Sequence, residues 1–323
     1  MIDDPVLLRE WYPVATSAQL ADGQLRPARV MEEDLVLWRA GGRISAWKDL
    51  CIHRGAKLSL GKVTADGCLQ CPYHGWIYDA GGACVKIPAH PDSKPLPRAR
   101  TEVYPVREAY GLVWVCLSRD PAPLPEFAEW EKPGFVNFTQ GPVAISALGP
   151  RIIENFLDLS HLPILHAGIL GVPERAEIGR YTVAKDASGV LARDIRIWQP
   201  NGDGKGRGDY ADYLYKVERP MAAYLAKRVK DAEITILIVA TPVDRERSLA
   251  TLAFAVKAES SADRGAMAAW ADQILGQDIP VVESQRPERL PLDLQTELHL
   301  PCDRTSIAYR QWIRELNLSF GTS

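Results

Sequence analysis

The sequence predicts an α+β protein with two domains: a small antiparallel β domain, followed by a larger domain in which helices accompany a second antiparallel sheet. Its length of 323 residues suits about two domains of ordinary size. Short strand-like runs separated by Gly and Pro fill the first half. In the second half, a helix-like segment precedes alternating runs that are rich in β-branched residues.

The first domain is expected over residues 1–140, including a connector. Residues 34–38 and 111–115 form strand-like runs, and turn residues separate them, as in small antiparallel β domains that present loops at one end. Prolines at 121, 123 and 125 indicate an extended segment after the last of these runs. We therefore expect the change of domain between residues 120 and 145.

The second domain is expected over residues 141–323. Residues 233–240 and 249–256 have the spacing and β-branched content of antiparallel strands. Residues 261–285 favour helix, and Pro280 indicates a new helical start there, because proline is well tolerated in the first turn of a helix. This domain therefore combines a sheet with helices.

Two short clusters of the first domain carry cysteine and histidine: Cys51-Ile52-His53 and Cys71-Pro72-Tyr73-His74. A binuclear iron–sulfur cluster needs four protein ligands, and two Cys with two His suit a [2Fe–2S] cluster in which imidazoles replace thiolates on one iron. Neutral imidazoles remove negative charge from that iron and raise its reduction potential. The pattern therefore predicts a protein that accepts and passes on electrons.

A structural Cys2His2 zinc site is the alternative interpretation of the same four residues, because it also draws its ligands from two short segments. Zinc fingers favour a pair of cysteines followed by a pair of histidines. Here each segment carries one cysteine and one histidine. The spacing favours the iron–sulfur cluster.

A second group of candidate ligands begins the second domain. His161 and His166 lie five residues apart, and two imidazoles with one carboxylate are the ligands of non-haem Fe(II) oxygenases. Five residues of regular helix would turn the two side chains apart. Pro163 lies between them and indicates a local break or bulge.

Asp158 precedes His161 by one helical turn. A carboxylate at this distance can orient a ligand imidazole through the nitrogen that does not bind the metal. The alternative is an ordinary carboxylate on a helix surface. We expect Asp158 to contact His161.

The segments Cys-Ile-His-Arg-Gly-Ala and Cys-Pro-Tyr-His-Gly-Trp resemble the two cluster loops of Rieske non-haem iron oxygenases, and Asn-x2-Asp-x2-His-x4-His resembles their iron motif. Respiratory Rieske proteins usually add a disulfide between the loops, but Ala56 and Tyr73 occupy those positions here. The resemblance covers nearly the whole chain. It is closest to oxygenases built from α subunits alone, particularly hydroxylases of paralytic shellfish toxin biosynthesis and aromatic O-demethylases.

The resemblance implies a role for each candidate residue. His161 and His166 would bind iron with Asp278 as the third ligand, and Glu283 is the local rival for that position. Asp158 would carry electrons to iron from a cluster histidine of the neighbouring subunit, for which His74 is the candidate. The resemblance also implies a Rieske [2Fe–2S] domain, a helix-grip catalytic domain and a head-to-tail homotrimer.

The implied activity is that of the terminal oxygenase component of a multicomponent Rieske monooxygenase. It would use O2 to hydroxylate or oxidatively dealkylate a small aromatic or heterocyclic molecule. A ring-dihydroxylating dioxygenase is one alternative. A Rieske electron carrier is another, but it leaves the candidate iron ligands without a role. Trp198, Tyr210, Tyr213 and Tyr215 are candidates for lining the substrate pocket, with packing in the core as the alternative.

The implied cofactors are a [2Fe–2S] cluster and a mononuclear Fe(II), with electrons from NAD(P)H through a separate reductase and, in some systems, a ferredoxin. The Gly-rich run at 201–209 lacks the spacing of a nucleotide-binding loop, and a mobile loop is the simpler interpretation. A net charge of -3 argues against nucleic-acid binding. We expect no signal peptide or membrane span, and a cytoplasmic location, because free thiols suit a reducing compartment.

Overall fold

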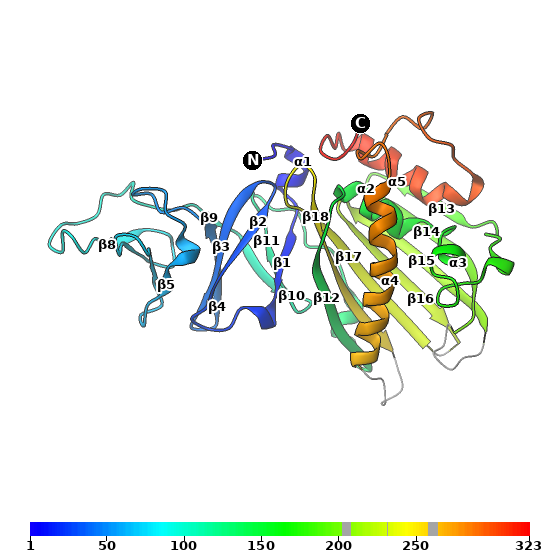
Figure 1. Cartoon of the computed structure of the whole chain (residues 1–323), viewed down its shortest axis with the longest axis horizontal. Helices are drawn as coiled ribbons and strands as arrows, with labels where there is room; N and C mark the ends of the chain where they lie inside the picture. The colour runs from blue at the N-terminus through cyan, green and yellow to red at the C-terminus, as the bar shows by residue number, and fades with distance from the viewer. Residues whose placement is uncertain (202–207, 231, 258–263) are drawn as a thin grey trace. The chain divides into compact units, whose positions relative to one another are not determined.

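The computed structural model describes residues 1–201, 208–230, 232–257 and 264–323. The chain divides into two compact units, Met1–Leu124 and Pro125–Ser323. The predicted boundary after residue 140 falls within strand β12 (Phe135–Ile145), which pairs with β18 (Ser248–Lys257) in the second unit. Figure 1 shows the elements of both units.

Antiparallel sheets form the first unit. In the order of each sheet, the strands are β1 (Tyr12–Thr16), β11 (Leu112–Val115) and β10 (Val106–Ala109); β2 (Leu25–Val30), β3 (Glu33–Ala40), β4 (Arg43–Lys48) and β9 (Val103–Tyr104); and β5 (Lys62–Val63), β6 (Leu69–Gln70), β7 (Ile77–Tyr78) and β8 (Cys84–Lys86). A short helix, α1 (Pro5–Leu8), and the 3-10 turns η1 (Ser17–Gln19) and η2 (Leu58–Leu60) connect them. The strands predicted at 34–38 and 111–115 are confirmed as parts of β3 and β11.

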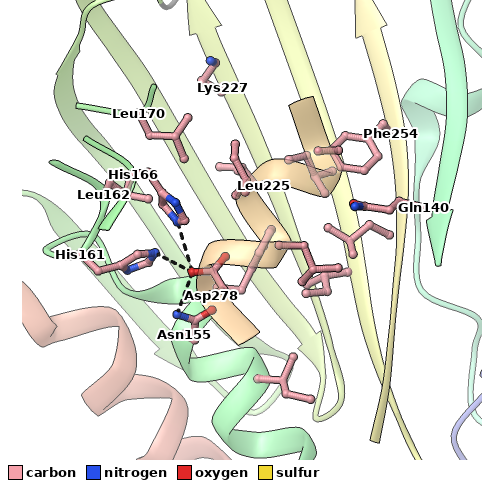
Figure 2. A pocket seen from close by; sticks show the side chains of 18 of the residues that line it. Gln140, Asn155, His161, Leu162, His166, Leu170, Leu225, Lys227, Phe254 and Asp278 are labelled. Carbon is pink, nitrogen blue, oxygen red and sulfur yellow. Dashed lines mark hydrogen bonds and ion pairs between the residues drawn. The ribbon is translucent and has the colours of Figure 1, made fainter. Parts of the chain in front are cut away.

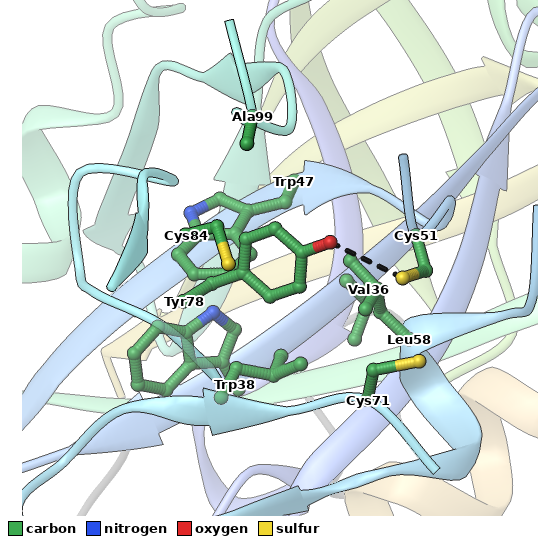
Figure 3. Close-up of a cluster of buried hydrophobic side chains, with 10 residues drawn as sticks. Val36, Trp38, Trp47, Cys51, Leu58, Cys71, Tyr78, Cys84 and Ala99 are labelled. Carbon is green, nitrogen blue, oxygen red and sulfur yellow. Dashed lines mark hydrogen bonds between the residues drawn. The ribbon is translucent and has the colours of Figure 1, made fainter. Parts of the chain in front are cut away.

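The core beneath the cysteine-bearing loops is aromatic. Trp38 and Trp47 meet edge to face with ring centroids 5.0 Å apart, and Trp47 meets Tyr78 in the same way at 6.5 Å. Figure 3 shows Cys51 and Cys71 beside these rings. Each of these two cysteines is only 2% exposed. Aromatic pairs in such arrangements stabilise a fold by more than the burial of their surface alone. The two cysteine-bearing loops therefore pack on a well-ordered core.

One seven-stranded antiparallel sheet forms the second unit. Its order is β12, β18, β17 (Ala232–Pro242), β16 (Ala222–Val229), β15 (Asp209–Arg219), β14 (Gly189–Gln199) and β13 (Thr182–Asp186). The strands predicted at 233–240 and 249–256 are confirmed as parts of β17 and β18. The remaining elements are α2 (Gly149–Leu157), α3 (Leu162–Leu165), α4 (Arg264–Ser284), α5 (Arg304–Glu315), η3 (Ala128–Glu131), η4 (Pro173–Arg175) and η5 (Pro301–Asp303).

Helix α4 crosses one face of this sheet (Figure 1) and packs against β12. Ala271, Leu275 and Val282 of α4 are buried, and Asp278 shares their spacing of three and four residues along one side of the helix. Helices α2 and α5 cover other strands of the sheet. The predicted α+β class, with a helix gripped by an antiparallel sheet, is confirmed.

The predicted new start at Pro280 is wrong, because α4 continues through this residue to Ser284. Proline removes one hydrogen bond, to the carbonyl of Gly276, and usually breaks a helix. Burial of Leu275 and Val282 on either side of Pro280 keeps the helix together, since most helical stability in proteins comes from tertiary packing.

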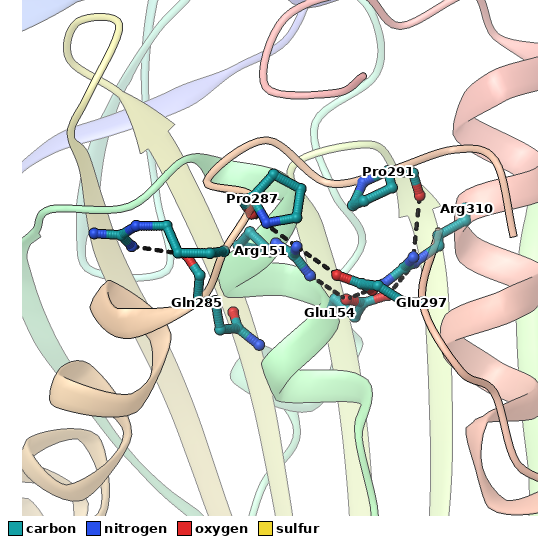
Figure 4. Close-up of polar contacts among 8 residues, drawn as sticks. Arg151, Glu154, Gln285, Pro287, Pro291, Glu297 and Arg310 are labelled. Carbon is teal, nitrogen blue, oxygen red and sulfur yellow. Dashed lines mark hydrogen bonds and ion pairs between the residues drawn. The ribbon is translucent and has the colours of Figure 1, made fainter. Parts of the chain in front are cut away.

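A buried ionic network joins α2 to α5 and to the segment between α4 and α5 (Figure 4). Arg310 of α5 donates to both carboxylate oxygens of Glu154, at 2.5 and 2.8 Å, and also contacts Glu297. Arg151 donates to Glu297 at 2.7 Å and to the carbonyl of Pro287 at 2.8 Å. The network therefore fixes α2, which leads into the second group of candidate ligands.

Candidate functional site

Two loops of the first unit, 51–56 and 71–76, have the same backbone plan. The Cys51 N–H donates to the Ala56 carbonyl at 2.8 Å, and the Cys71 N–H donates to the Trp76 carbonyl at 2.8 Å. Gly55 and Gly75 hold the corresponding position of each loop at φ of +72° and +71°, a conformation that favours glycine. Each loop therefore presents its cysteine and histidine in a tight turn.

The cysteines and histidines of these loops differ in their exposure to solvent. The thiols of Cys51 and Cys71 are buried, whereas His74 is exposed and His53 is half-buried. The Nδ1 atoms of His53 and His74 lie 3.1 Å apart. Two imidazole nitrogens that face each other at this distance can bind the same metal ion. The four residues therefore fit a cluster in which thiolates bind one iron and imidazoles bind the other.

All six cysteines are free, including those outside the two loops. The Tyr78 hydroxyl lies 3.1 Å from the Cys51 sulfur. Sequence reasoning did not single out Tyr78, because its contact with Cys51 spans 27 residues and two different segments.

The break expected at Pro163, between His161 and His166, is wrong, because the short helix α3 joins these two residues and the interruption lies earlier, at Asp158. Helix α2 ends at Leu157, and Asp158 follows in an extended conformation. One Asp158 oxygen accepts from the Ser160 N–H and hydroxyl at 3.1 and 2.8 Å, and the other accepts from the His161 N–H at 3.1 Å. Pro163 lies in the first turn of α3, where its missing N–H costs little.

The turn brings His161 and His166 together with Asp278 of α4 (Figure 2). The Nε2 atoms of His161 and His166 lie 3.6 and 3.2 Å from the Asp278 Oδ1 atom. The candidate ligand atoms of all three residues lie within 4.8 Å of one another. Asn155 of α2 adds an amide nitrogen 3.4 Å from the same Asp278 oxygen.

Both imidazoles are oriented by a hydrogen bond at Nδ1. Asp158 Oδ2 lies 2.8 Å from Nδ1 of His161, as expected from the spacing, and Gln277 Oε1 lies 2.8 Å from Nδ1 of His166. Acceptors at Nδ1 leave each Nε2 with a lone pair that faces Asp278. Among the described residues, the buried Nε2 of His166 makes no hydrogen bond of acceptable geometry. The group therefore fits a divalent metal ion.

The charge state of the flanking groups follows from these contacts. Burial raises the pKa of Asp158, but hydrogen bonds from His161 and Ser160 outweigh it and hold that pKa below its usual value. Burial lowers the pKa of His166, whereas Asp278 and Gln277 outweigh it and raise that pKa. Asp158 is therefore a carboxylate at neutral pH, able to hold the His161 imidazole in one orientation.

Glu283, the rival to Asp278, accepts a hydrogen bond from the Ser146 N–H at 2.7 Å. Five residues along α4 rotate it well away from the side of the helix that carries Asp278. The described part of the chain brings Asp278, and not Glu283, together with His161 and His166.

Comparison with known proteins supports the interpretation of both groups of candidate ligands. Residues 10–105 match the family model of the Rieske [2Fe-2S] domain, and residues 145–318, more than half of the chain, match that of the vanillate O-demethylase oxygenase C-terminal domain. The chain belongs to the Rieske non-haem iron oxygenases. As a member, it is an oxidoreductase of the monooxygenase type, with a Rieske [2Fe–2S] cluster and a mononuclear non-haem iron as its cofactors.

This Rieske oxygenase is 34% identical to methylxanthine N1-demethylase NdmA of Pseudomonas putida, over 95% of this chain and 88% of that protein. It is 31% identical to methylxanthine N3-demethylase NdmB of the same species, over 99% of this chain and 92% of that protein. The solved structure of NdmA with caffeine has a TM-score of 0.85 and 32% identity, and the match covers 96% of this chain and 91% of that one. Among the described residues, no helix is both long and apolar enough to cross a bilayer.

The candidate iron ligands of the Rieske oxygenase lie at the wall of a cavity in the second unit. Most of the lining is apolar and comes from the sheet and α4, including Leu225, Ile236, Leu252, Phe254 and Leu275. A cavity lined mainly by apolar side chains with a few polar groups is typical of a site for a small organic molecule. It places such a molecule next to His161, His166 and Asp278.

Of the four aromatic residues considered for the pocket, Tyr213 and Tyr215 line it and Trp198 and Tyr210 do not. The alternation along β15 explains this, because Tyr213 and Tyr215 point to the buried face while Tyr210 is 47% exposed. Trp198 pairs with Tyr210 across β14 and β15, and Arg175 stacks on its ring. The Gly-rich run at 201–209 lies mostly outside the described residues.

Sequence reasoning missed Gln277, Lys227 and Gln199. Gln277 precedes the expected ligand Asp278, so an amide beside a ligand carboxylate is a signal that could have been followed. Lys227 lines the cavity although lysines are rarely buried, and Gln199 contacts it from another strand. Nothing in the local pattern marks these two.

Proposed function

We propose that this Rieske oxygenase hydroxylates or oxidatively dealkylates a small aromatic or heterocyclic molecule. The observation that carries the proposal is the convergence of His161, His166 and Asp278 at the wall of a largely apolar cavity. The names of NdmA and NdmB describe N-demethylation of methylxanthines, and this chain covers most of both proteins. Removal of an alkyl group is therefore the favoured reaction.

We assign Cys51, His53, Cys71 and His74 to the [2Fe–2S] cluster, and His161, His166 and Asp278 to Fe(II). When bound, the two centres supply reductive activation of dioxygen. Asp158 and Gln277 hold the two imidazoles so that their Nε2 atoms face the metal position. The apolar lining excludes water and presents one C–H bond of the substrate to that position.

Electrons come from NAD(P)H through a separate reductase, with or without a ferredoxin. The described chain offers the two sets of metal ligands but no recognised nucleotide motif. We further propose a head-to-tail homotrimer in which Asp158 meets the partner subunit's His74, and a cytoplasmic location, which suits six free cysteines.

The test uses the purified chain loaded with iron and sulfide, a surrogate reductase, NADH and a panel of methyl ethers and N-methyl heterocycles. Demethylation consumes one O2, two electrons and two protons, and yields the demethylated product, formaldehyde and water. Oxygen uptake, formaldehyde and product are therefore expected in a ratio of 1:1:1. Mass spectrometry with labelled dioxygen identifies hydroxylated products.

Other outcomes correspond to other functions. A ring-dihydroxylating dioxygenase would place two labelled oxygen atoms in one product. A Rieske electron carrier would be reduced and reoxidised without oxygen uptake coupled to product. Either result would contradict the proposal, as would a purified protein that binds zinc in place of iron and sulfide.

A further inference from the structure

Lys227 of β16 is buried in the wall of the cavity that contains the candidate iron ligands. It is 6% exposed and lines the same cavity as His161, His166 and Asp278. Figure 2 shows it apart from these ligands, with Leu170 between Lys227 and His166 in the view. Lysines are almost never fully buried unless their charge is compensated, because removing an ammonium from water costs several kcal/mol.

One polar side chain holds Lys227. Its Nζ atom donates to Gln199 Oε1 at 3.0 Å. The Gln199 amide nitrogen donates to the Leu170 carbonyl at 3.2 Å and contacts the Tyr213 hydroxyl. Because a carbonyl can only accept, the amide orientation is fixed, with its oxygen toward Lys227. An ammonium has three donors, and the part of the chain that the structure describes gives Lys227 one acceptor, so two N–H groups are left for a ligand.

The charge of Lys227 is not balanced by an acidic side chain among the described residues. Burial is the cause that lowers its pKa to about 8, and no neighbouring carboxylate opposes this. The Trp270 ring of α4 lies 5.9 Å from Nζ and offers a cation–π contact, which offsets only part of the desolvation. An anion entering the cavity would supply the missing partner.

We propose that Lys227 binds the carboxylate of a small aromatic acid, whose alkyl group then reaches the His161–His166–Asp278 group. The inference rests on the proposed function, since it names the substrate class of the same cavity. A neutral carbonyl group would satisfy one N–H donor but would leave the charge uncompensated, whereas a carboxylate satisfies both remaining donors and the charge. Apolar side chains that line the same cavity, including Leu225 and Ile236, then contact the aromatic ring.

Binding measured at equilibrium tests this without turnover. The probes are the three isomeric methoxybenzoates and their amides, which have nearly the same shape but no charge, added to the metal-loaded protein in a calorimeter. At least one acid is expected to bind about tenfold or more tightly than its amide, since hydrogen bonds between charged groups are stronger than those to a neutral partner. Equal affinity in every pair, including no measurable binding of either member, would overturn the proposal.

The variants are Lys227→Met and, as a matched control, Lys216→Met. Lys216 is exposed on β15, on the opposite face of the sheet. Lys227→Met is expected to abolish the preference for the acid, and Lys216→Met to retain it. A preference that survives in Lys227→Met would assign the anion to another group and contradict the inference.

A stability measurement separates a binding lysine from a structural one. Without ligand, Lys227→Met is expected to raise the melting temperature, because it replaces an uncompensated buried charge by an apolar side chain of similar volume. A structural lysine would show the opposite, a lower melting temperature. That result, together with unchanged acid binding by the folded fraction, would refute the proposal.

The pH dependence gives a further check. The acids are ionised throughout the neutral range, so their affinity should stay constant below pH 8 and weaken about tenfold per pH unit above it, as Lys227 loses its proton. Tyr213, Gln199 and Trp270 face Lys227 from β15, β14 and α4, and His161, His166 and Asp278 share the cavity. Only the part of the pH dependence that Lys227→Met removes belongs to Lys227.

Turnover distinguishes the two proposals. Demethylation of amides and acids with equal efficiency would leave the proposed function in place and remove the carboxylate site. Tight binding of an acid that is lost in Lys227→Met, with no oxygen uptake or formaldehyde under any condition, would support the carboxylate site and contradict the oxygenase assignment.

Discussion

The Tyr78 hydroxyl and the Gln277 amide each contact one residue of the two groups of candidate metal ligands. Tyr78 contacts the sulfur of Cys51, and Gln277 contacts Nδ1 of His166. Neither residue is a candidate ligand itself. Each contacts a candidate ligand through one hydrogen bond, which is how proteins commonly adjust the electron density and the orientation of metal-binding groups.

Tyr78→Phe is expected to lower the reduction potential of the cluster by roughly 50 mV or more, because a hydrogen bond to a ligand sulfur stabilises the more negative, reduced state. Spectroelectrochemical titration of the purified protein measures the potential. Tyr104→Phe, which alters another buried hydroxyl of the first unit, is the control and should leave the potential unchanged. An unaltered potential in Tyr78→Phe would show that the hydroxyl does not act on the cluster.

Asp278→Asn is expected to release most of the mononuclear iron while the visible absorption of the cluster remains, because a neutral amide is a poorer ligand for Fe(II) than a carboxylate. Activity should fall with the iron content. Iron and sulfide analysis measures both centres. Glu283→Gln is the matched control, since Glu283 contacts the Ser146 N–H instead, and iron loss in that variant would reverse the assignment.

At the scale of elements, the mononuclear site depends on the end of α2, the start of α3 and one side of α4. Asp158 terminates α2 by accepting hydrogen bonds from Ser160 and His161. After this turn, the side chains of His161 and His166 both point toward Asp278. Helix α2 itself is held in place by the ionic network of Arg151, Glu154, Glu297 and Arg310, which joins it to α5. Secondary structure alone would not bring the ligands together.

Arg310→Met is expected to destabilise the second unit by about 3–5 kcal/mol, because it leaves the buried Glu154 and the half-buried Glu297 with only Arg151 to compensate two carboxylates. Chemical denaturation followed by tryptophan fluorescence measures the change. Arg314→Met on the exposed side of α5 should change the stability by less than about 0.5 kcal/mol. Similar effects in both variants would mean that the network does not stabilise the fold.

At the scale of the whole molecule, the two groups of candidate ligands belong to separate compact units, and the proposed function requires electrons to pass from one metal centre to the other. The proposed trimer brings His74 of one subunit to Asp158 of the next. Asp158 already accepts four hydrogen bonds within its own turn, so a partner imidazole would replace one from Ser160 or share an oxygen with it. Subunit contact and electron transfer would thus be coupled.

Asp158→Asn is expected to keep both metal centres and the trimer mass, yet to reduce coupled product formation by about 10–100-fold or more, since contacts of this kind orient the ligand and its partner. Rapid mixing of the prereduced protein with O2 and substrate should show a cluster that is no longer reoxidised at the normal rate. Ser160→Ala removes only local hydrogen bonds and should remain active. Near-normal product formation by Asp158→Asn, or a monomer in solution, would contradict the relay.

The residue types and their spacing by themselves determined the chemistry and the fold class of this protein. Cysteine and histidine in two short segments, and two histidines near a carboxylate, indicate ligand chemistry that few other functions require. The strands of β3, β11, β17 and β18 were also predictable, because alternation and β-branched residues are local properties. The two-domain α+β class follows from the same signals.

How residues far apart in the chain come into contact depends on the packing of the elements. Gln277 contacts His166 across 111 residues, and Lys227 of β16 contacts Gln199 of β14 although β15 lies between the two strands, so neither contact has a local signature. The same holds for α4, which continues through Pro280 because its buried side packs on the sheet. Short segments determine which residues are ligands, whereas the groups that orient ligands and select a substrate depend on packing between segments far apart in the chain.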